Sequence, residues 1–147
     1  MNKTIASCSL IVWVGLWFLL VAAAPWSISD SNSFLKGFVN QEFLSFMGVV
    51  VTITLASVAN LYLALNGLED RVDRPIFIKT KSHIRHSAYM LIAMLVCSLV
   101  LVVLKPLIVC GERSAAFVNG ASITVVWISI LILIDLTKAA FNLDPRV

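Results

Sequence analysis

The residues best suited to chemistry stand together in one polar stretch, residues 66–86. This stretch contains both histidines of the chain, His83 and His86, three positions apart. On a helix this spacing places both imidazoles on one face, where they could bind a metal ion or an anionic lipid headgroup. No cysteine or carboxylate stands at a spacing that would complete a metal site. The sequence therefore predicts no metal and no other cofactor.

Basic side chains are concentrated in the same stretch. They are Arg71, Arg74, Lys79, Lys81 and Arg85. Two interpretations stay open, because such charges can bind a cytosolic protein or rest against the negative cytoplasmic face of a membrane. The formal net charge of the whole chain is only +3, so nucleic-acid binding is not indicated.

Groups that would support catalysis are missing from the sequence. A Ser-His-Asp set is not credible with both histidines in one stretch, and no phosphate-binding loop or Gly-rich fingerprint is present. The three cysteines, Cys8, Cys97 and Cys110, make neither a CxxC pair nor a disulfide framework. We expect them to be small apolar fillers and predict that the protein is not an enzyme.

The composition indicates a membrane protein. Apolar residues make up 60% of the chain and charged residues 13%, and the mean hydropathy is +0.97. A soluble domain of this length could not bury so much apolar surface, so the excess must face lipid.

Four apolar segments are long enough to cross a membrane. They cover about residues 5–24, 43–65, 87–104 and 115–136, with a cytoplasmic loop at 66–86. The first could instead be a signal peptide ending at Ala22-Ala23-Ala24, but its apolar run is long for a signal core and Pro25 follows directly. We therefore expect a single membrane domain, residues 1–147, an all-α antiparallel bundle of four transmembrane helices.

Local signals predict where these helices begin and end. Asp30 or Ser31 could cap a short amphipathic helix at the membrane surface before the second span, although this segment could also be the outer end of that span. Asn66-Gly67 is a good stop for the second helix, although residues 68–74 could extend it briefly as far as Pro75, and residues 76–80 should be extended. Thr80 or Ser82 should cap the third helix, and Lys105-Pro106 should mark its outer end, where the lysine can reach headgroups.

Small and weakly polar residues form a stripe on each of two helices. The stripes are Thr52, Ala56, Ala59 and Asn60 in the second span, and Asn119, Ser122 and Ser129 in the fourth. Such faces let helices approach closely and hydrogen-bond in lipid. A helix-packing role and a pore-lining role both stay open. Asp135, one turn before Lys138, is expected to form an ion pair with it at the membrane boundary.

The distribution of basic residues predicts the orientation. With four spans, one side holds eight basic residues, including those at 71–85, and the other holds Lys36, Lys105 and Arg113. Basic residues are enriched on the cytoplasmic side, so both termini are predicted to be cytoplasmic.

Resemblances to known families bear on function through size and span number. The chain is similar in both to the membrane-bound glutathione transferase and leukotriene synthase family, whose inner-helix Arg-Ala-His-Asn core is absent here, since residues 65–69 read Leu-Asn-Gly-Leu-Glu. Small drug/proton antiporters carry a carboxylate within the first span, which here has no charge. By architecture alone, and with no shared motif, the chain resembles the small four-span membrane subunits of bacterial antiphage operons such as Kiwa. That resemblance implies a bacterial inner membrane and a defence role.

Two classes of function follow. In the first, the protein is an oligomeric membrane subunit that anchors or signals to a cytosolic partner through its basic central stretch. In the second, several copies form an ion channel or a membrane-permeabilising pore lined by one of the two polar stripes.

Overall fold

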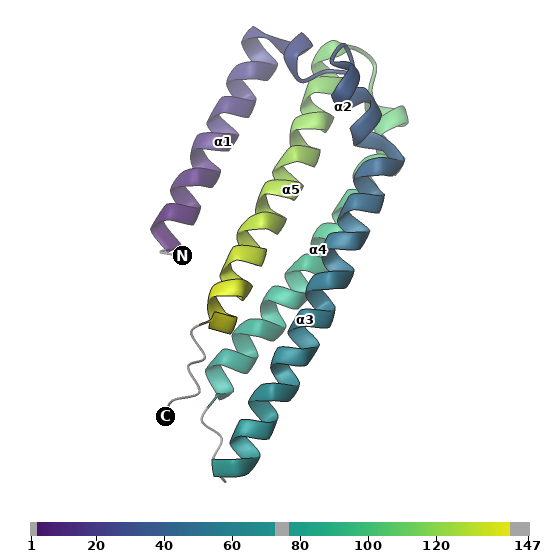
Figure 1. The fold of residues 1–147 in the computed structure, drawn as a ribbon. Coiled ribbons are helices and arrows are strands. Elements are labelled where there is room, and N and C mark those ends of the chain that lie inside the picture. The colour runs from purple at the N-terminus through teal and green to yellow at the C-terminus, as the bar shows by residue number, and fades with distance from the viewer. Residues whose placement is uncertain (1–2, 73–76, 142–147) are drawn as a thin grey trace.

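The computed structural model describes residues 3–72 and 77–141, and these fold into helices joined by short turns (Figure 1). Four helices are long: α1 (Lys3–Ala23), α3 (Phe43–Val72), α4 (Ile78–Ile108) and α5 (Glu112–Phe141). Three short helical segments, η1 (Pro25–Ser27), α2 (Ser33–Gly37) and η2 (Phe38–Glu42), join α1 to α3. The four long helices are each long and apolar enough to cross a membrane. This confirms the predicted all-helical class with four candidate spans, as in a multi-pass membrane protein.

The packing centres on α3, α4 and α5. Figure 1 shows α4 beside both α3 and α5, while α1 lies along α5. A core cluster of Val51, Leu65, Ile84, Leu91 and Leu136 joins the three central helices. Many other large apolar side chains point outward, which is the arrangement expected of helices surrounded by lipid.

Tryptophans hold α1 against α5. The Nε1 of Trp13 donates to the Oγ1 of Thr124 over 2.9 Å, and the Nε1 of Trp127 donates to the Oγ of Ser9 over 3.0 Å. Each bond satisfies an indole N–H that lipid cannot satisfy. Farther along the helix pair, Trp17 lies directly over Gly120, where no side chain intervenes.

The entry into α3 is a short helix followed by a kink. Asn32 caps α2, because its Oδ1 accepts hydrogen bonds from the backbone N–H groups of Phe34 and Leu35. The expectation that Asp30 or Ser31 would cap this helix is wrong. The π-helical segment η2 has non-helical dihedral angles at Val39 and Asn40. Whether α2 rests on the membrane surface stays a prediction.

The predicted loop at 66–86 is mostly helix, so the stop at Asn66-Gly67 is wrong, whereas the possible brief extension of the second helix is present up to Val72. The segment expected to be extended at 76–80 is helical from Ile78 on. α3 continues through Asn66-Gly67 to Val72, and α4 begins at Ile78. Phe77 occupies the cap position, with neither Thr80 nor Ser82 in that role. The cause is packing, because Leu65 and Ile84 are fully buried in the shared core and both helices gain by continuing past it.

The other end of α4 also differs from expectation. The helix runs through Pro106 to Ile108, so Lys105-Pro106 does not end it. A tight turn to α5 follows, in which the Oγ of Ser114 accepts from the backbone N–H groups of Cys110 and Gly111, 3.0 Å each. Cys8, Cys97 and Cys110 are all exposed in the subunit, so they are not the buried small apolar fillers that the sequence predicted.

Candidate functional site

The charged end of the α3–α4 hairpin is the first candidate site. The two helices have 30 and 31 residues, so each is about 45 Å long, whereas the hydrocarbon layer is about 30 Å thick. Figure 1 shows this end of the hairpin reaching beyond the neighbouring ends of α1 and α5. This end of the hairpin contains four basic residues among those described, Arg71, Lys79, Lys81 and Arg85.

Glu69 fastens the two helices of the hairpin together. Its Oε1 accepts the backbone N–H of Phe77 over 2.7 Å, and its Oε2 forms an ion pair with the Nζ of Lys81. The side chains of Glu69 and Lys81 are only 14% and 16% exposed. Lys81 also lies 5.6 Å from the ring centroid of Tyr62. Lys81 therefore holds the hairpin together, and its charge is largely taken up by Glu69.

The other predicted binding residues of this end differ in their surroundings. Arg71, Lys79, Arg85 and His86 are exposed. The Nε2 of His83 lies 3.4 Å from the Oδ2 of Asp135, an ion pair when the histidine is protonated. The expected pairing of Asp135 with Lys138 is wrong, since among the described residues Asp135 contacts His83 instead. Arg74 lies outside the described residues.

Metal chemistry has no visible basis in the described part of the chain. Within residues 3–72 and 77–141, no three side chains of His, Cys, Asp or Glu come together in a way that could hold an ion. His83, His86 and the Asp135 carboxylate beside His83 thus form no group of three ligands among those residues.

The two polar stripes lie in different environments. Thr52, Ala56, Ala59 and Asn60 are all exposed on α3. Asn119, Ser122 and Ser129 are buried at 0%, 0% and 2% exposure. The hydroxyls of Ser122 and Ser129 donate to carbonyls one turn earlier in their own helix. The α5 stripe therefore lies inside the subunit, and the α3 stripe lies on its surface.

A second polar site, which the sequence did not predict, lies at the opposite end of the bundle. Lys105, only 6% exposed, donates from its Nζ to the Oδ1 of Asp30 over 2.9 Å and to the carbonyl of Val39 over 3.2 Å. The Nδ2 of Asn119 donates to the same Oδ1 and to the carbonyl of Ile28, 3.0 Å each. These contacts tie α4 and α5 to the segment that joins α1 to α3.

The electrostatics of Asp30 follow from these partners. Burial by itself would raise the pKa of its carboxyl group, but the hydrogen bonds from Lys105 and Asn119 and the positive charge of Lys105 hold the pKa below its ordinary value. The carboxylate is therefore ionised at neutral pH and forms a true ion pair. This site joins elements and carries no nucleophile, so its chemistry is structural.

Comparison with known proteins yields no relative: no family model, no curated protein and no solved structure matches this chain.

Proposed function

We propose that this protein is a non-enzymatic, oligomeric subunit of a bacterial inner membrane that binds an acidic surface of a cytosolic protein. The binding surface is the exposed basic end of the α3–α4 hairpin, around Arg71 and Lys79. In this proposal all four long helices cross the membrane as an antiparallel bundle, and both termini lie in the cytoplasm, as the distribution of basic residues favours. A role in defence against phage rests on the resemblance in architecture alone.

This proposal rests mainly on the length of the two hairpin helices and on the exposed cations at their end. A link between two spans needs only a few residues, as the turn at Cys110 and Gly111 illustrates. Here the helices continue past the bundle, Glu69 joins them, and exposed cations remain on the outside. A rigid, charged projection can bind a partner with little loss of conformational entropy.

Co-purification tests the proposal most directly. The full-length protein is solubilised in detergent and captured, and co-purifying soluble proteins are identified by mass spectrometry. We expect one soluble protein in stoichiometric amount, with binding that weakens as salt screens the charges. The variant Arg71→Gln/Lys79→Gln should insert normally, because Arg74, Lys81 and Arg85 still mark this side as cytoplasmic. It should lose the partner.

The matched control is Arg113→Gln, which removes an exposed charge from the other end of the bundle. This variant should keep the partner. Retention of the partner by Arg71→Gln/Lys79→Gln would refute the docking surface.

The pore alternative has weaker structural support. A pore assembled from several copies needs a polar face at the boundary between subunits. The Asn119, Ser122 and Ser129 stripe is buried within one subunit, so that of the two predicted stripes the exposed Thr52 and Asn60 remain for such a lining. Conductance of purified protein in planar bilayers, lost on Asn60→Leu, would favour the pore over the anchor.

A further inference from the structure

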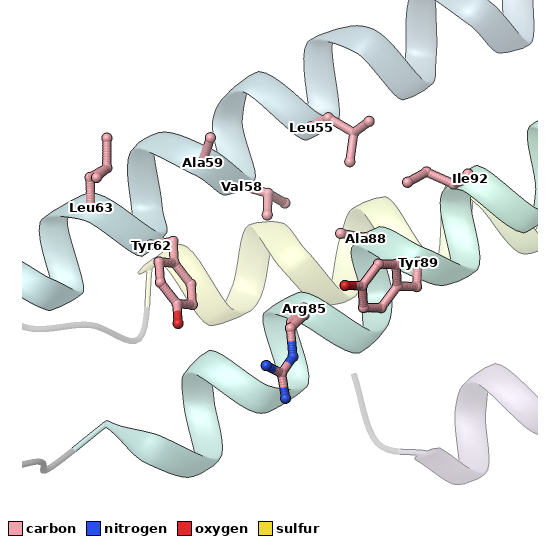
Figure 2. A pocket seen from close by; sticks show the side chains of 9 residues that line it. All are labelled: Leu55, Val58, Ala59, Tyr62, Leu63, Arg85, Ala88, Tyr89 and Ile92. Carbon is pink, nitrogen blue, oxygen red and sulfur yellow. The ribbon is translucent and has the colours of Figure 1, made fainter.

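A groove of about 470 Å³ lies between α3 and α4 (Figure 2). Its walls are mainly apolar side chains: Leu55, Val58, Ala59 and Leu63 from α3, and Ala88 and Ile92 from α4. Three side chains with polar ends complete it, namely Tyr62, Arg85 and Tyr89. The groove thus combines a long apolar wall with one cation.

The position of the groove along the bundle matches the inner membrane boundary that the sequence predicts. Both tyrosines of the chain line it, and tyrosine is enriched where hydrocarbon meets headgroups. Arg85 lies two residues before the predicted third span. From Arg85 to Ile92 the α4 wall is about 10 Å long at 1.5 Å per residue, and it leads from the boundary into the predicted hydrocarbon layer. A molecule that fills the groove therefore has a polar end at Arg85 and an apolar end at Ile92.

Arg85 is the cation of the groove lining that is available to bind a ligand. The neighbouring carboxylate, Glu69, is already bound by Lys81 and by the backbone N–H of Phe77. Among the described residues, no acidic side chain lies within ion-pair distance of Arg85. A guanidinium group matches a phosphate well, because its N–H groups form paired hydrogen bonds to two oxygens.

We propose that this groove binds one anionic phospholipid of the inner leaflet. The lipid phosphate lies on Arg85, within reach of the tyrosine hydroxyl groups, and one acyl chain follows the apolar wall toward Leu55 and Ile92. A free phosphate ion would leave that wall uncovered. A zwitterionic lipid would bring its own cation beside Arg85. The lipid site is separate from the proposed protein surface, since Lys79 lies about 9 Å farther out along α4.

Native mass spectrometry of the full-length, detergent-purified protein tests this site. Phosphatidylglycerol and phosphatidylcholine of the same chain length are added in turn. We expect wild-type protein to bind phosphatidylglycerol about tenfold more tightly, the effect of one or two hydrogen bonds to a charged group. Arg85→Gln should remove this preference. Ala59→Phe, which fills the groove from an exposed position, should weaken the binding of both lipids.

Controls separate this lipid site from general charge attraction. Lys79→Gln removes a nearby exposed cation that does not line the groove, and it should keep the lipid preference. Thermal unfolding identifies any variant that fails to fold, and Arg85→Lys, which keeps the charge, should retain part of the preference. The proposal is overturned by equal wild-type binding of both lipids, by an equal loss in Lys79→Gln, or by displacement of the lipid by millimolar inorganic phosphate. Loss of the protein partner with retained lipid binding would leave the lipid site standing without the proposed anchor.

Discussion

Lys105 is the residue whose replacement should reveal most about stability. Asp30→Asn would leave the ammonium group of Lys105, whose side chain is 7% exposed, without a counter-charge. Breaking a buried ion pair in this way lowers the unfolding free energy by about 3 kcal/mol. Lys105→Met should cost less, because the Asp30 side chain is 33% exposed and water can reach it. The double variant should recover most of the loss. SDS-induced unfolding in mixed micelles measures all three, and additive losses in the double variant would contradict a direct ion pair.

The lowered pKa of Asp30 predicts how this site responds to acid. The ordinary pKa of the group is 3.8, and the folded protein holds it lower. The folded state therefore binds fewer protons, and the stability from the pair is fully present above pH 3.8 and lost as the pH falls through the folded pKa. The difference in unfolding free energy between wild type and Asp30→Asn should be constant from pH 7 to pH 5 and shrink below pH 3.8. A difference that shrinks between pH 7 and pH 5 would contradict this assignment.

Sequence patterns could not reveal this pair. Lys105 stands before a proline at the end of an apolar run, which is also the pattern of a lysine that reaches the headgroups. Its partner, Asp30, lies 75 residues earlier in a polar link where an acidic residue resembles a helix cap. Local sequence patterns describe Lys105 and Asp30 separately. They do not show that the two side chains are in contact, because that contact depends on how α4 packs against the link.

Among the elements, α1 approaches α5 very closely at Gly120. Trp17 lies over Gly120, so a Cβ at that position would overlap the indole ring. Gly120→Ala should destabilise the fold by about 1 to 3 kcal/mol through overpacking. It should also shift the tryptophan fluorescence, because Trp13, Trp17 and Trp127 lie along this helix pair.

The matched control for the α1–α5 contact is another helical glycine. A Cβ added at Gly48 in α3 would meet no neighbouring atom within 4 Å, so Gly48→Ala should be neutral or stabilising by up to about 1 kcal/mol. Equal effects of the two substitutions on unfolding and fluorescence would show that Gly120 is not a contact point.

Tertiary packing also explains which helix boundaries could be predicted from the sequence and which could not. Four apolar runs of spanning length are visible in composition alone, and all four appear as helices. The stop at Asn66-Gly67 failed because one glycine costs a helix only about 1 kcal/mol. Burial of Leu65 and Ile84, with the bonds from Phe77 and Lys81 to Glu69, outweighs that cost. Such compensation comes from tertiary packing and is absent from any short window of sequence.

For the molecule as a whole, the orientation can be tested with one native cysteine. Cys110 is exposed in the turn between α4 and α5, which the proposed topology places outside the cytoplasm. In a Cys8→Ala/Cys97→Ala background, a membrane-impermeant maleimide should label Cys110 in intact cells. With Cys110→Ser and Lys79→Cys added, labelling should require permeabilised cells. Labelling of both positions in intact cells would refute the four-span arrangement.

Assembly is the remaining property of the whole molecule, and the exposed α3 stripe is where it can be tested. Thr52, Ala56 and Asn60 contact no other helix of the subunit closely enough to be buried, yet a polar asparagine gains little from facing lipid. A second copy placed on this stripe would let the two helices approach closely and give each Asn60 a hydrogen-bond partner.

Ala56→Leu should therefore shift the protein to a smaller species in size-exclusion chromatography with light scattering. Because Ala56 is exposed within the subunit, secondary structure by circular dichroism should stay unchanged. Leu107→Ala, a change of similar size at a residue 74% exposed on α4, is the control and should leave the oligomer intact. If Ala56→Leu keeps the wild-type mass, the subunits meet elsewhere or the protein is monomeric, and the small-residue stripe has no part in assembly.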